Sequence, residues 1–118
     1  SGFVFQHDRC VPGTRLRPDF LLAAPALAWF VVVEVDEEQH ARAGYSPASE
    51  AARMAALQKA LGAPVVFLRF NPDAFRVDGV LTRVPAYLRH RHLAARLRAH
   101  LACPPERALV VERLFFST

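Results

Sequence analysis

The feature that most constrains the fold is an apolar run, Trp29–Val33, that passes directly into Glu34 and Asp36. A run of β-branched and aromatic residues is typical of a strand buried on both faces. Side chains alternate along a strand, so Glu34 and Asp36 share one face and Val35 takes the other. Two such carboxylates repel each other unless a cation separates them, and their hard oxygens suit Mg²⁺ or Mn²⁺. The alternative is a strand that simply ends at the surface in an acidic turn.

The rest of the chain predicts an α/β domain with a mixed sheet in the order β-β-α-β-α-β, flanked by helices. Ser46-Pro47 is typical of a helix start and Gly62 of a helix end. The short spacing between the first two strands favours an antiparallel hairpin. The strand, helix and strand that follow favour a right-handed parallel crossover. We expect strands over 19–24, 28–36, 65–70 and 108–116, helices over 46–61 and 86–102, and a short edge strand over 3–6.

Size and composition predict one domain, residues 1–118, because 53% apolar residues are enough for a single core. No window holds the roughly 18 apolar residues of a membrane span, and no basic-then-apolar leader opens the sequence. We therefore expect an intracellular protein with no membrane partner. The net charge of +4 favours a polyanionic partner, and residues 79–118 hold seven Arg against two Glu.

Charged residues interrupt the first predicted helix and the strand after it. Glu50 projects into the apolar stripe of the helix, so we expect it to face Glu34 and Asp36; the alternative is a first-turn acid paired with Arg53. Arg69 lies inside an apolar strand and needs a carboxylate or a phosphate as its partner. An internal salt bridge and a phosphate-binding role both remain open for it.

Three further groups of residues could carry chemistry. His40 follows Asp36 by four residues and could transfer a proton, or it is an ordinary surface histidine. The arginines of the second helix could track phosphates, or they form a solvated face. His7-x-x-Cys10 and His100-x-x-Cys103 could join in a tetrahedral Zn²⁺ site, or the two cysteines are unrelated thiols.

Together these motifs resemble the PD-(D/E)XK nuclease superfamily, and more closely its branch related to very-short-patch repair endonucleases. The resemblance covers residues 17–73 and rests on four motifs: Arg17-Pro18-Asp19, Glu34-x-Asp36-x-x-x-His40, Glu50-x-x-Arg53 and Arg69-Phe70-Asn71-Pro72-Asp73.

The resemblance implies a restriction-endonuclease-like α-β-β-β-α-β core, although no clear helix precedes Asp19 in this sequence. It also implies that Asp19 and Glu34 bind the catalytic metal, with the backbone carbonyl of Val35 as a further ligand. The superfamily commonly has lysine where this chain has Asp36. The repair-like branch does not keep that lysine, and we assign proton transfer to His40 instead.

We therefore expect a Mg²⁺- or Mn²⁺-dependent endonuclease that hydrolyses phosphodiester bonds in DNA, with RNA not excluded. Asp19, Glu34 and Asp36 would bind the metal, and Arg53 or Arg69 would stabilise charge on the phosphate. A domain of this size would dimerise or belong to a longer polypeptide. The alternatives are a catalytically silent nucleic-acid-binding module and a structural or interaction domain. The residues expected to contact nucleic acid are Arg17, Asn71, Arg89, Arg91, Arg96 and Arg98.

Overall fold

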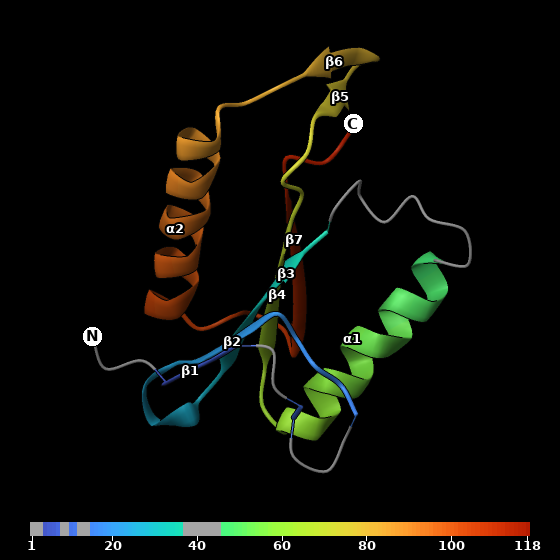
Figure 1. The fold of residues 1–118 in the computed structure, drawn as a ribbon. Helices are drawn as coiled ribbons and strands as arrows, with labels where there is room; N and C mark the ends of the chain where they lie inside the picture. The colour runs from blue at the N-terminus through green and yellow to red at the C-terminus, as the bar shows by residue number, and fades with distance from the viewer. Residues whose placement is uncertain (1–3, 8–9, 12–14, 37–45) are drawn as a thin grey trace.

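The computed structural model describes residues 4–7, 10–11, 15–36 and 46–118, the first of these ranges by its backbone. Their centre is a five-stranded sheet in the order β1-β2-β3-β4-β7 (Figure 1). The strands are β1 (Val4–His7), β2 (Phe20–Ala23), β3 (Phe30–Val35), β4 (Val65–Phe70) and β7 (Leu109–Leu114).

The sheet is mixed, as the sequence predicted. β1, β2 and β3 pair antiparallel, whereas β3, β4 and β7 run parallel. Helix α1 (Pro47–Leu61) connects β3 to β4, and helix α2 (Ala86–Ala102) precedes β7. The short 3-10 helix η1 (Pro25–Leu27) turns the chain between β2 and β3. Parallel neighbours bring the carboxyl ends of β3 and β4 to one edge of the sheet, where Glu34 pairs in register with Arg69.

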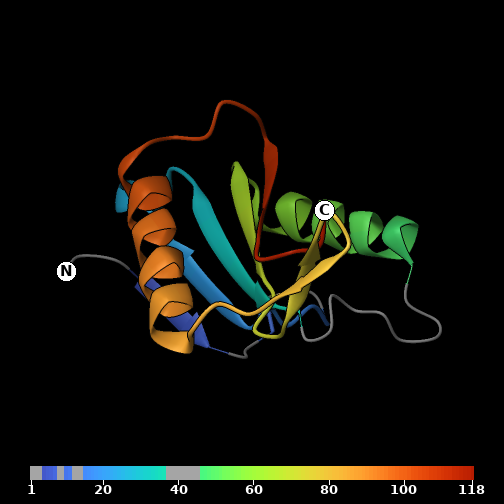
Figure 2. The same cartoon turned by 90° about the horizontal axis from the view of Figure 1, so that it is seen from above.

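The two helices cover opposite faces of the sheet (Figure 2). Met54 and Leu57 of α1 pack on one face with Val32 and Phe67, and Leu101 of α2 packs on the other with Val33. Ser46 Oγ accepts a hydrogen bond from the Ser49 N–H and caps α1, as predicted. Within the described ranges, neither helix has the length and the apolar composition that crossing a bilayer requires.

A small hairpin of β5 (Phe75–Val77) and β6 (Val80–Thr82) was not predicted. It stands beyond the edge of the sheet at which β3 and β4 end (Figure 1). Asp78 and Gly79 form its tip with φ of 49° and 81°, the left-handed conformation that a two-residue hairpin loop needs. Asp-Gly between apolar residues is a strong hairpin signal, so the sequence did contain the information. The end of the chain adds to β5, because the Thr118 N–H donates to the Arg76 carbonyl at 2.9 Å.

Candidate functional site

The candidate site lies at the carboxyl ends of β3 and β4, beneath the first turn of α1. Glu34, Asp36 and Arg69 share the sheet face that α1 covers, as the alternation of side chains predicted. They are only 6%, 1% and 3% exposed. Charges buried to this extent need partners, and the structure supplies them from within the chain.

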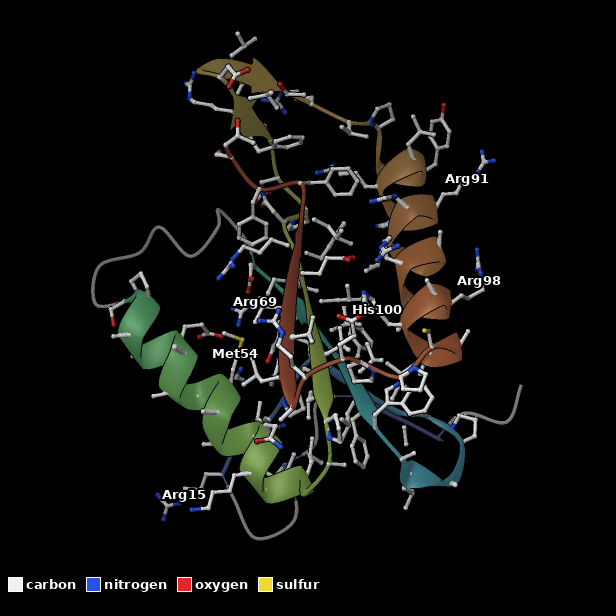
Figure 3. All side chains as sticks on the ribbon, turned by 180° about the vertical axis from the view of Figure 1, so that it is seen from behind. Arg15, Met54, Arg69, Arg91, Arg98 and His100 are labelled. Atoms are coloured by element: carbon white, nitrogen blue, oxygen red, sulfur yellow. The ribbon has the colours of Figure 1, made fainter. Side chains whose placement is uncertain are left out.

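Arg69 is the centre of the buried charges. It donates from Nε to Asp36 Oδ2 at 2.6 Å and from Nη2 to Asp36 Oδ1 at 2.8 Å, and its Nη1 bonds Glu50 Oε1. Figure 3 shows Arg69 between the sheet and α1, on the same side as Met54. The internal salt bridge left open by the sequence is therefore the arrangement present, and the inward orientation predicted for Glu50 is confirmed.

A second arginine neutralises Glu34. Arg53 Nη1 lies 2.5 Å from Glu34 Oε1 and 3.7 Å from Glu50 Oε1. Its Nη2 donates to the backbone carbonyl of Arg17 at 3.4 Å, which links α1 to the segment before β2. Unlike Arg69, Arg53 keeps 28% of its side chain exposed, so its guanidinium is accessible from solvent.

Asp19, the residue before β2, lies next to the end of β3. Its Oδ2 accepts a hydrogen bond from the Val35 N–H at 2.7 Å, so its carboxylate lies beside the backbone next to Glu34. Burial raises the pKa of Glu34; Arg53 works against this rise, and the charge of Asp19 adds to it. Among the described residues, no donor bonds Oδ1 of Asp19 or Oε2 of Glu34.

The three acids predicted to hold a metal do not converge as one group. Within the described ranges, no three His, Cys, Asp or Glu side chains gather closely enough to hold an ion. Both oxygens of Asp36 are bonded to Arg69, so a guanidinium supplies the positive charge that the sequence led us to expect from a metal. Asp19 and Glu34 each keep one carboxylate oxygen that no donor among the described residues bonds.

The predicted zinc ligands also stay apart where they can be described. Cys10 and Cys103 are exposed free thiols, and His100 Nε2 lies 3.3 Å from Glu112 Oε1. The side chain of His7 is outside the described part of the chain. His40, the predicted proton-transfer group, also lies outside the described residues.

Three of the residues expected to contact nucleic acid form hydrogen bonds with other parts of this chain. Asn71 is 0% exposed, and its Nδ2 donates to the Phe115 carbonyl at 2.9 Å. Arg96 donates to both Glu112 oxygens at 2.7 and 2.8 Å, and Arg89 donates to the Asp73 carbonyl at 3.2 Å. These bonds hold α2, β7 and the turn after β4 in place, a structural role that a sequence pattern does not distinguish from phosphate binding.

The other arginines of that set are exposed. Arg91 and Arg98 extend from α2 away from the sheet (Figure 3). They lie on the layer opposite α1, so the basic side of α2 does not adjoin Asp19 and Glu34. Arg17, two residues before Asp19, is exposed, and its backbone carbonyl accepts the hydrogen bond from Arg53.

No family model, no curated protein and no solved structure matches this chain. The site is therefore interpreted from its own chemistry.

Sequence reasoning did not single out two features of the structure. Glu112 lies in an apolar strand, the same signal that drew attention to Arg69, and its pKa is lowered chiefly by the hydrogen bond from Arg96. Arg83 follows the β5–β6 hairpin directly before α2 and is exposed. Had the Asp78-Gly79 turn been used to predict the hairpin, Arg83 would have stood out as a basic residue in the short connection between the hairpin and α2.

Proposed function

We propose that this domain is a divalent-metal-dependent endonuclease that hydrolyses phosphodiester bonds in DNA. The observation that carries the proposal is the bond from the Val35 N–H to Asp19, which holds this carboxylate beside the backbone next to Glu34. The mixed sheet supports it: three antiparallel strands, a helix and a parallel strand follow one another, as in the β-β-β-α-β part of the core that the resemblance implies.

The residues fit a small hard cation in part. Asp19 and Glu34 each keep a carboxylate oxygen without a hydrogen bond among the described residues, and these oxygens are the ligands that Mg²⁺ prefers. The backbone carbonyl of Val35 would be a third ligand. Bound Mg²⁺ or Mn²⁺ would polarise the phosphate and make water a better nucleophile. Asp36, bonded to Arg69, would hold the end of β3 in position.

The two arginines differ in what they could do for a phosphate. Arg69 is buried and held by Asp36 and Glu50, so it would keep the site rigid. Arg53 is partly exposed and bonds Glu34, so it could exchange this carboxylate for a phosphate oxygen as negative charge develops there. Proton transfer is assigned to His40. Arg17, Arg91 and Arg98 would contact the backbone of the nucleic acid, in a homodimer or as part of a larger polypeptide.

The test is nicking of supercoiled plasmid with Mg²⁺ or Mn²⁺, comparing the wild type with Glu34→Gln and Asp19→Asn. Both substitutions keep side-chain size and remove one charge, and we expect at least about a hundredfold loss of rate because a metal ligand is lost. Glu106→Gln is the matched control, since Glu106 is exposed in the turn after α2. Equal nicking by all four proteins would trace the activity to a contaminant and reject the proposal.

A catalytically silent nucleic-acid-binding module is the second candidate, because internal arginines already neutralise Glu34, Asp36 and Glu50. It differs from the nuclease in its response to metal. A ligand that binds only the folded state raises Tm with concentration. The nuclease should gain Tm with Mn²⁺ in the wild type and not in Glu34→Gln, whereas the silent module should show no metal-dependent difference between them.

A further inference from the structure

A hollow of about 410 Å³ opens at the carboxyl edge of the sheet, on the α2 side. The turn that follows β4 forms one wall, and the start of α2 forms the other. Two arginines, Arg83 and Arg89, contribute to the walls, against one acid, Asp73. The hollow is therefore a basic cavity, and none of its lining residues belongs to the candidate site around Asp19 and Glu34.

Both arginines have N–H groups without an acceptor among the described residues. Arg83 is exposed and makes no hydrogen bond or ion pair with any described residue. Arg89 is anchored through Nη1, which bonds the carbonyls of Pro72 and Asp73. Its Nε is buried and has no acceptor among the described residues. A buried donor without an acceptor is rare, so this Nε is a donor that a bound water or anion in the hollow would satisfy.

Pro85 and Ala86 at the start of α2 line the same hollow. Pro85 is the N-cap and provides no side-chain hydrogen bond, and no acid lies in the first turn. The N–H groups of Leu88 and Arg89 bond the Pro85 carbonyl. Those of Ala86 and Tyr87 have no acceptor in the described part of the chain. Free N–H groups and the helix dipole both favour an anion at this end.

We propose that this hollow binds a phosphodiester group of a nucleic-acid strand. The inference builds on the proposed function and assigns a second point of contact to the same substrate. Pro72 and Asp73 follow Arg69 by three and four residues, so the hollow and the Asp19–Glu34 pair lie at the same edge of the sheet. The pair lies on the α1 side and the hollow on the α2 side. A strand that crosses this edge would present one phosphate to each.

The proposal is tested by binding of a short labelled DNA duplex in EDTA, where cleavage cannot occur. Arg83→Ala removes the unbonded guanidinium, and Ala86→Glu puts a carboxylate at the mouth of the hollow. Each should weaken binding about tenfold, and Arg83→Ala should reduce the slope of log K against log salt by about 1. Ala86→Glu should keep or raise Tm, because an acid in the first turn favours the helix. Weaker binding by a protein of equal or higher Tm cannot come from unfolding.

Matched controls separate this site from general attraction. Arg107→Ala and Ala56→Glu make the same charge changes at exposed positions to which no substrate contact is assigned, and they should bind nearly as well as wild type. Binding by Arg83→Ala and Ala86→Glu equal to wild type would overturn the proposal, as would equal weakening by the controls. Inorganic phosphate that displaces the duplex at equal phosphate concentration would also overturn it, because the site would then recognise a free anion.

The binding experiment and the nicking experiment can fail separately. A protein that binds DNA through Arg83 but never nicks plasmid contradicts only the nuclease. A protein that nicks plasmid through Glu34 but binds equally well with Arg83→Ala contradicts only the phosphate site.

Discussion

Arg69 bonds both carboxylate oxygens of Asp36 at a position where neither side chain reaches solvent. Each charge is tolerable only because the other is present. Arg69 also bonds Glu50, the acid in the first turn of α1. One buried guanidinium therefore joins β3, β4 and α1 at the edge of the sheet where Asp19 and Glu34 meet.

Arg69→Met should destabilise the domain by about 3–5 kcal/mol, because it leaves Asp36 buried and without its partner. Urea unfolding at pH 7 measures this loss. Arg69→Met combined with Asp36→Leu should recover much of the stability, since the buried charge of Asp36 is removed and Glu50 keeps Arg53 at 3.7 Å. Arg98→Met, on the exposed side of α2, should stay within about 0.5 kcal/mol of wild type. A single Arg69→Met protein as stable as this control would show that the buried pair is not formed.

Glu34→Gln should leave the free energy of unfolding unchanged or raise it at pH 7. Burial raises the pKa of Glu34, so the folded protein binds this proton more tightly than the unfolded chain does. The stability contributed by this group is greatest below the ordinary glutamate pKa and is lost as the pH rises through the raised pKa. The advantage of Glu34→Gln should therefore shrink as the pH falls into that range. Unfolding curves measured across this pH range test the prediction. A Glu34→Gln protein that loses most stability, relative to wild type, at pH 7 would contradict it.

Arg96→Met should cost between about 0.2 and 1 kcal/mol at pH 7, as expected for a partly exposed ion pair. The hydrogen bond from Arg96 holds the pKa of Glu112 below its ordinary value. This stability is present above the ordinary pKa and is lost as the pH falls through the lowered one. Wild type and variant should become equally stable in acid below that point. A difference that persists there would show that Arg96 acts through packing of its aliphatic stem.

Gly62→Ala should destabilise the domain by about 1 kcal/mol through backbone strain. Gly62 ends α1 with φ of 70°, and a Cβ there would meet no atom within 4 Å. The cost is therefore conformational and not a clash. Gly62→Asn is the matched substitution, because asparagine tolerates the left-handed region better than alanine. Thermal unfolding should rank the proteins in the order glycine, asparagine, alanine. An alanine variant with the highest Tm would contradict this account.

Local patterns were enough to predict the sheet and both long helices. The apolar run into Glu34, the Ser46-Pro47 start and the Gly62 end all act within a few residues, where propensity and alternation decide. They also predicted that Glu50 faces the sheet and that Arg69 needs a partner of opposite charge. The Asp78-Gly79 hairpin was within reach of the same reasoning, because its turn signal is local.

Only the tertiary structure decided which charged side chains pair with one another. The sequence showed that the acids at 34, 36 and 50 needed a positive partner. The choice between a metal and Arg53 or Arg69 depends on distances across two strands and a helix. The same holds for Arg96, whose partner Glu112 is 16 residues away, and for Asn71, which bonds a carbonyl 44 residues away. A periodic pattern gives the direction of a side chain along its own element, whereas an ion pair depends on which elements become neighbours.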